Sequence, residues 1–122
     1  MIRILLTILT IISLSTPVMA GSVDGNILWC PDKSSTSMRN HTGYSFQNNQ
    51  VVIFSIEGYE IKTTAYPYIE RGPSEILIGR ISIDRGTLKI NNVTQCYLVD
   101  STQVIEQHLQ ETIEAVKAQN KI

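Results

Sequence analysis

The chain has 122 residues, with ten lysines and arginines against eleven acidic residues and a formal charge of −1. This length supports one domain with a small hydrophobic core. No basic run or stripe is present, which excludes the electrostatic signature of a nucleic-acid-binding protein. No internal repeat, charge block or low-complexity tract divides the chain.

Residues 1–20 have the composition of a secretory signal peptide. Arg3 supplies a positive start, an apolar run follows, and Val18 and Ala20 are the small residues that a signal peptidase reads. The run is shorter than the ~20 residues of a spanning helix, so we expect cleavage after Ala20 and no membrane span. The mature chain, residues 21–122, is expected in the periplasm or outside the cell, with a formal charge of −2 once Arg3 is removed.

Cys30 and Cys96 are the two cysteines of the chain. An even cysteine count in an exported protein predicts a disulfide, with free buried thiols or a catalytic cysteine as the alternatives. The bridge would stabilise the fold by roughly 4 kcal/mol on a loop-entropy model. It would tie a first strand at residues 26–30 to the last strand of the sheet. Trp29, beside Cys30, is expected to pack over the bridge.

Residues 50–99 predict antiparallel strands joined by tight turns. The first hairpin begins with the β-branched, apolar run 51–56. Gly58 can adopt the positive φ of a two-residue turn, so Glu57-Gly58 is the predicted loop and Ile56 is expected opposite Tyr59. This register places the apolar side chains of both strands on one face, with Ile53 as an exception.

A second hairpin is predicted at residues 81–90, where two registers compete. A three-residue loop, 84–86, places Ile83 opposite Thr87. A two-residue loop, Arg85-Gly86, instead pairs Ile83 with Leu88. A slip of one residue exchanges the two faces of a strand, so the register that aligns the apolar residues is favoured.

A third turn is predicted at Asn91-Asn92. As a two-residue loop it pairs Leu88 with Gln95, whereas one extra residue aligns Leu88 with Cys96. We therefore expect a bulge or a longer loop. Earlier, within the predicted strand 75–84, the isoleucines occupy even positions before Gly79-Arg80 and odd positions after it. This change indicates a bulge or sharp bend at Gly79-Arg80, of the kind that curls a sheet toward a barrel.

From Asp100 the apolar spacing becomes helical. Asp100, Ser101 and Thr102 offer N-cap side chains, and the predicted helix covers about 102–121. Its apolar stripe comprises Ile105, Leu109, Ile113 and Val116. We expect this stripe to dock on the sheet, with docking on a partner as the alternative. The predicted fold class is mainly β: a small antiparallel meander curled into a sandwich or barrel, with one C-terminal amphipathic helix.

Two polar segments carry the candidate binding residues. Residues 66–74 contain two prolines and a glycine, which exclude a central strand and favour a stiff loop. Tyrosine and arginine are favoured at binding hot spots, so Tyr66, Tyr68 and Arg71 are the leading candidates, with packing of the tyrosines onto the barrel rim as the alternative. Arg39 and His41, in the polar loop 32–43, are the expected neighbours.

The sequence does not predict an enzyme, a metal site or a cofactor. His41 and His108 are the two histidines, and a metal site usually needs three or four ligands. Ser34, Ser35 and Ser37 lie near His41, but no nucleophile motif frames them. His108 is expected to be half-exposed on the helix.

Trp29-Cys30, the β-meander and Cys96 together resemble the small periplasmic barrels that inhibit C-type lysozymes. The resemblance covers residues 28–98 and rests on the strand plan and the cysteine spacing. The Ser-Gly-x-x-Tyr inhibitory loop of that family is absent, and Tyr66-Pro67-Tyr68 stands near its place. We expect an exported, non-catalytic binding or interaction domain for a protein or small ligand. The alternatives are an inhibitor of a secreted or cell-wall hydrolase, which the resemblance implies, and a small-ligand carrier.

Overall fold

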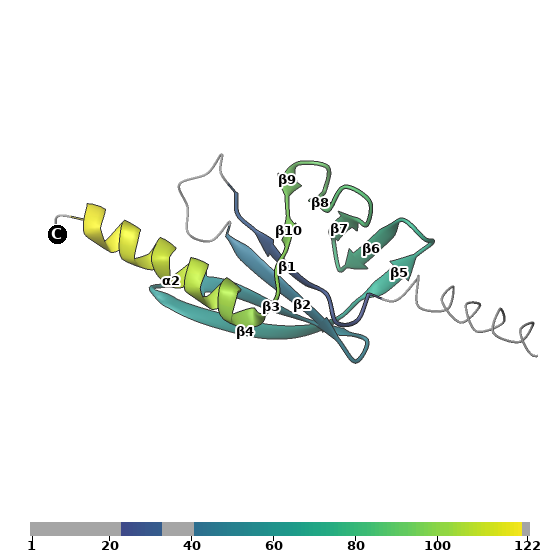
Figure 1. The fold of residues 1–122 in the computed structure, drawn as a ribbon, viewed down its shortest axis with the longest axis horizontal. Coiled ribbons are helices and arrows are strands. Elements are labelled where there is room, and N and C mark those ends of the chain that lie inside the picture. Colours follow the sequence, from purple (N-terminus) through teal and green to yellow (C-terminus); the bar gives the residue numbers. More distant parts are fainter. Residues whose placement is uncertain (1–22, 33–40, 121–122) are drawn as a thin grey trace, which may run out of the picture.

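The computed structural model describes residues 23–32 and 41–120 (Figure 1). The expected signal peptide, its cleavage site and Arg39 lie outside the described residues. No helix within those two ranges has both the length and the apolarity needed to cross a bilayer.

Two antiparallel five-stranded sheets form most of the fold. Sheet A has the order β10-β1-β2-β3-β4 and sheet B the order β5-β6-β7-β8-β9. The strands are β1 (Ile27–Cys30), β2 (Thr42–Gln47), β3 (Gln50–Glu57), β4 (Glu60–Pro67), β5 (Ile69–Arg71), β6 (Glu75–Ile78), β7 (Ile81–Asp84), β8 (Lys89–Ile90), β9 (Thr94–Gln95) and β10 (Tyr97–Leu98). The mainly β prediction is confirmed. The two sheets do not close into a barrel.

The two faces of sheet A pack against different partners. On β3, Phe54 and Ile56 face the helix, whereas Val51 and Ile53 face sheet B. Successive side chains of a strand point to opposite faces, so an apolar run on β3 fills two cores at once. Ile53 is therefore no exception in the pattern: it belongs to the second core.

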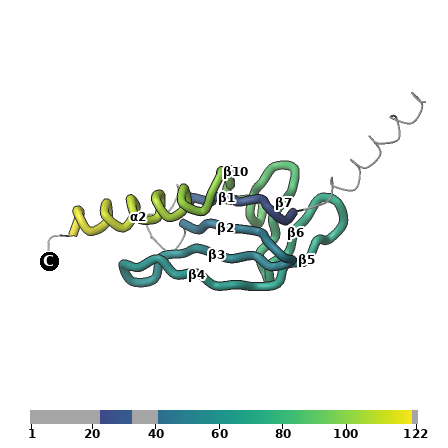
Figure 2. Tube along the Cα trace, turned by 60° about the horizontal axis from the view of Figure 1, so that its bottom comes forward, coloured from purple at the N-terminus to yellow at the C-terminus, as the bar shows by residue number. Residues whose placement is uncertain are grey.

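The helix α2 (Thr102–Gln119) packs along sheet A (Figure 2). Ile105, Leu109 and Ile113 are fully buried, which confirms docking on the sheet. Ser101 is the N-cap residue, but its side chain forms no capping hydrogen bond. The predicted side-chain cap is therefore wrong, and the packed apolar stripe holds the helix in place.

The β3–β4 turn is shifted from its predicted position. Ile56 pairs with Ile61, not with Tyr59, and the loop is Gly58-Tyr59. Gly58 has φ 67°, which places the glycine first in the loop, as in a type II′ turn. The shift pairs two isoleucines at the hairpin end and leaves each side chain on its predicted face.

The favoured two-residue loop between β7 and β8 is also wrong. Ile83 pairs with Ile90, and the loop is longer. Asp84 Oδ1 accepts the backbone N–H groups of Gly86 at 2.7 Å and Thr87 at 2.9 Å. Short-range bonds from an aspartate to the following backbone stabilise a turn without help from strand pairing. The side chain of Asp84 thus offsets the lost Ile83–Leu88 pair.

The two remaining turn predictions have different outcomes. Between β8 and β9 the loop spans residues 91–93, and the carbonyl of Leu88 accepts the N–H of Cys96 at 2.8 Å. This confirms the longer loop and the alignment that it implies. Gly79-Arg80, by contrast, is a hairpin turn, because Ile78 pairs with Ile81. The predicted strand 75–84 is therefore two strands. Their pairing explains why the isoleucines change from even to odd positions across the turn.

Residues 66–74 are mostly strand rather than loop. β4 continues to Pro67 and β5 begins at Ile69, so the chain passes from sheet A to sheet B at Tyr68. Both strands are edges of their sheets, which confirms that the prolines keep this segment out of a central position.

Cys30 and Cys96 form the predicted disulfide, which joins the end of β1 to the segment between β9 and β10. Trp29 does not pack over this bridge. Cys30 belongs to the core beneath sheet B, whereas Trp29 lies among the residues that contact the helix. Neighbouring residues of one strand face opposite ways, so the two cannot share a core.

Candidate functional site

Sheet B covers only part of the inner face of sheet A, and a groove of about 400 Å³ lies where the cover ends. One wall is the β3–β4 hairpin and the other is the turn between β6 and β7. The lining residues, hereafter the Tyr66 groove, are Ile53, Ser55, Thr64, Tyr66, Ile78, Gly79, Arg80 and Ile81.

The floor of the Tyr66 groove is continuous with the protein core. Ile78 is buried, and Ile53 and Ile81 are half-buried against the same core. The side chain of Tyr66 is 47% exposed and forms part of the wall. Large aromatic side chains that remain exposed beside an apolar hollow are characteristic of ligand sites.

The polar side chains that line the groove can each donate a hydrogen bond. Ser55 and Thr64 contribute hydroxyl groups from neighbouring strands. Arg80 is the one charged residue among the described residues that line the groove, and its side chain forms no ion pair with any described residue. Farther along this face, Lys62 pairs with Glu57 at 3.3 Å, so that cation is already matched.

The turn at Gly79 places Arg80 in this position. Gly79 has φ 58°, a conformation that glycine adopts without steric cost. The resulting two-residue turn closes the β6–β7 hairpin directly over sheet A and sets Ile78 and Ile81 side by side. The groove therefore depends on a local turn and on the packing of one sheet against the other.

Tyr68, predicted as a binding residue, has packing contacts of its own. Its ring meets that of Phe46 edge-on at 5.2 Å, and its hydroxyl donates to Asp24 Oδ1 at 2.6 Å. Burial, the hydrogen bond to Asp24 and the charge of that carboxylate raise the pKa of Tyr68 to about 12. The side chain therefore joins the segment before β1 to the crossing between the sheets.

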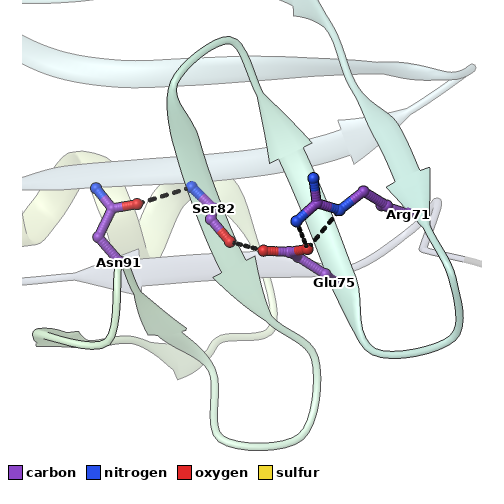
Figure 3. Close-up of polar contacts among 4 residues, drawn as sticks. All are labelled: Arg71, Glu75, Ser82 and Asn91. Atoms are coloured by element: carbon purple, nitrogen blue, oxygen red, sulfur yellow. Dashed lines mark hydrogen bonds and ion pairs between the residues drawn. The ribbon is translucent and has the colours of Figure 1, made fainter.

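Arg71 lies on the opposite, outer face of sheet B (Figure 3). Its Nη2 and Nε contact Glu75 Oε1 at 2.7 and 2.8 Å, and Ser82 donates to the other carboxylate oxygen. Asn91 Oδ1 accepts the backbone N–H of Ser82 at 3.0 Å. These contacts tie together β5, β6, β7 and the loop after β8.

The contacts of Arg71, Glu75 and Ser82 hold neighbouring strands together and so have a structural role. The hydrogen bond from Ser82, reinforced by Arg71, holds the pKa of Glu75 below its usual range. A carboxylate stabilised in its charged form is a weak base, and a serine nucleophile needs a base that accepts its proton. Both histidines lie elsewhere, on the helix face of sheet A.

His41 stacks on Trp29 with ring centroids 6.2 Å apart, and His108 stacks on the same indole at 5.0 Å. His41 Nδ1 is buried and has no hydrogen-bond partner among the described residues. The side chain of His108 is 42% exposed, as predicted. This stack and the Tyr66 groove lie on opposite faces of sheet A. In the described ranges, no three His, Cys, Asp or Glu residues are grouped as metal ligands would be.

The predicted site residues are therefore not brought together. Tyr66 lines the groove, Tyr68 packs at the crossing, Arg71 lies on the outer face of sheet B, and His41 stacks beneath the helix. The sequence prediction placed a bulge or sharp bend at Gly79-Arg80, where the structure has a turn, but it did not identify Arg80 as a site residue. No family model, no curated protein and no solved structure matches this chain.

Proposed function

We propose that this chain is an exported, non-catalytic binding domain whose site is the Tyr66 groove. The observation that carries the proposal is the incomplete cover of sheet A, which leaves aliphatic and aromatic side chains at the floor and wall of a groove. A groove of this size with a few converging polar groups is the usual form of a binding site.

Export is supported by two further features. The disulfide between Cys30 and Cys96 is the kind of bond that persists outside the reducing cytosol. The sequence before the described residues has the composition of a secretory signal. A small exported domain with an open groove fits binding better than catalysis, because the cluster of Arg71, Glu75 and Ser82 is engaged in contacts within the fold.

Thr63 and Thr64 offer a matched pair for testing the site. They are neighbours on β4, both are exposed, and their side chains lie on opposite faces of sheet A. A photo-crosslinking residue is placed at each position in turn, and the protein is irradiated in its own exporting host. We expect adducts from position 64 and far fewer from position 63, because only Thr64 lines the groove.

The mass of the adduct separates the possible classes of ligand. A small-molecule adduct identifies a carrier, and an adduct with a secreted hydrolase identifies an inhibitor. Equal labelling from both positions, or labelling from neither, contradicts the proposal that the Tyr66 groove is the site.

A further inference from the structure

We infer that the occupant of the Tyr66 groove is a free amphipathic carboxylate, with its aliphatic chain on the isoleucine floor and its carboxylate on Arg80. This inference rests on the proposed function and specifies the ligand class of the same site. It combines the position of the one charged lining residue with the apolar character of the remaining floor.

The floor favours an aliphatic chain. Ile53, Ile78 and Ile81 come from three different strands and present side chains to one hollow. Removing apolar surface from water is favourable, and each methylene that becomes buried strengthens binding by about fourfold. A ligand without a chain leaves this surface in contact with water.

Arg80 favours a carboxylate as the head group. A guanidinium presents parallel N–H donors that match the two oxygens of a carboxylate. The hydroxyls of Ser55 and Thr64 supply further donors on the opposite wall. No acidic residue is among the described residues that line the groove, so an anion meets no like charge from them, while a cationic head group would meet Arg80.

The size of the groove favours a small molecule over a protein surface. Its volume of about 400 Å³ lies within the range of ligand pockets, roughly 300–1,000 Å³. A stable protein interface involves roughly 20–30 residues on each partner, whereas eight described residues line this groove.

Isothermal titration calorimetry below the micelle concentration tests the inference with three probes that share one chain: decanoate, decanol and decyltrimethylammonium. We expect decanoate to bind at least about tenfold more tightly than decanol, as a charge-assisted hydrogen bond implies. The ammonium probe is expected to bind most weakly. Shortening decanoate to octanoate is expected to weaken binding by about fourfold for each methylene removed.

Two matched variant pairs separate the contributions of head and chain. Arg80→Gln is expected to remove the preference for decanoate over decanol, whereas Lys89→Gln, an equal loss of charge on an exposed strand residue, leaves it unchanged. Thr64→Trp fills the groove and is expected to abolish binding of the alkyl probes, whereas Thr63→Trp on the opposite face does not. Circular dichroism of each variant checks that the fold is retained.

Equal affinity for all three probes, or an unchanged preference in Arg80→Gln, overturns the carboxylate assignment. If no alkyl probe binds while position 64 still crosslinks to another molecule, the ligand class is wrong and the proposed site stands. If position 64 gives no selective adduct either, the proposed function fails as well.

Discussion

Gly43 and Ile105 are in contact so close that a side chain at position 43 has no space. A Cβ built on Gly43 would lie 2.4 Å from Ile105 Cγ2, well inside van der Waals contact. The absence of a side chain at this position of β2 lets the first turn of α2 approach the sheet. The position of the helix therefore depends on the lack of a side chain at Gly43 as well as on the apolar stripe.

Gly43→Ala is expected to destabilise the protein by about 1–3 kcal/mol, the usual cost of overpacking a core. Urea unfolding followed by circular dichroism measures this free energy. The double variant Gly43→Ala, Ile105→Val removes one methylene at the clash and is expected to recover part of the loss. If Gly43→Ala unfolds at the same urea concentration as the unaltered protein, the close approach of helix and sheet is wrong.

The disulfide is expected to contribute a large share of the stability. Replacing both Cys30 and Cys96 by serine is expected to cost about 2–5 kcal/mol, as for other small exported domains. Equilibrium unfolding of the two proteins without reductant gives the difference. Thiol labelling of the denatured, unreduced protein provides the control: two labelled cysteines would show that the bridge does not form.

The sequence predicted more of the local structure than of the assembly. The β-rich class, the disulfide, the helix and the proline-containing edge segment follow from composition and spacing, which act over a few residues. β2 was missed, although Tyr44 and Phe46 alternate with small residues and are buried. Asn48-Asn49 was also a usable turn signal, and both residues adopt positive φ.

The errors in register and site have a common physical cause. Asp84 bonds to the backbone after it and so permits a longer loop than strand pairing alone would select. The Tyr66 groove is lined both by Ile53 of sheet A and by Arg80 of the turn between β6 and β7. Their placement beside one groove depends on how the two sheets pack, which no short stretch of sequence encodes. Tyr66 was identified by its residue type, whereas Arg80 required the tertiary structure.

The raised pKa of Tyr68 predicts that the stability of the fold changes at alkaline pH. Its pKa in the folded protein, about 12, lies above its ordinary value of 10.0. A group with a raised folded-state pKa contributes stability that is present below pH 10 and is lost as the pH rises toward 12. Tyr68→Phe is expected to unfold more easily at pH 8, by about 1 kcal/mol for the lost hydrogen bond to Asp24.

The difference between the Tyr68→Phe variant and the unaltered protein is expected to shrink between pH 10 and pH 12. Urea unfolding across that range measures it, and subtraction of the two curves removes the contribution of the other tyrosines. Tyr59→Phe is a control, because the Tyr59 hydroxyl accepts a hydrogen bond from Asn120 Nδ2 and does not donate to a described carboxylate. A difference that is constant with pH would contradict the raised pKa.

The lowered pKa of Glu75 predicts that stability is lost at acidic pH instead. Its folded-state pKa lies below the ordinary value of 4.5, chiefly because Ser82 donates to it and Arg71 pairs with it. Its contribution to stability is therefore present above pH 4.5 and is lost as the pH falls through the lowered value. Glu75→Gln is expected to unfold more easily than the unaltered protein at pH 7 and to show little difference at the lowest pH that both tolerate. Glu106→Gln, on the exposed face of α2, serves as a control for loss of charge.

The buried stripe of α2 is expected to tolerate no charge. Leu109 and Ile113 have no exposed surface, so Leu109→Asp buries a carboxylate that has no partner among the apolar residues around it. We expect that variant to be unfolded at 25 °C. Leu109→Ala is expected to remain folded at a cost of about 2–5 kcal/mol, which keeps the comparison measurable. Gln110→Asp changes the adjacent, exposed residue and is expected to melt within a few degrees of the unaltered protein. If Leu109→Asp melts at the same temperature as Gln110→Asp, the helix does not depend on its contact with sheet A. Its apolar stripe is then available to a partner instead.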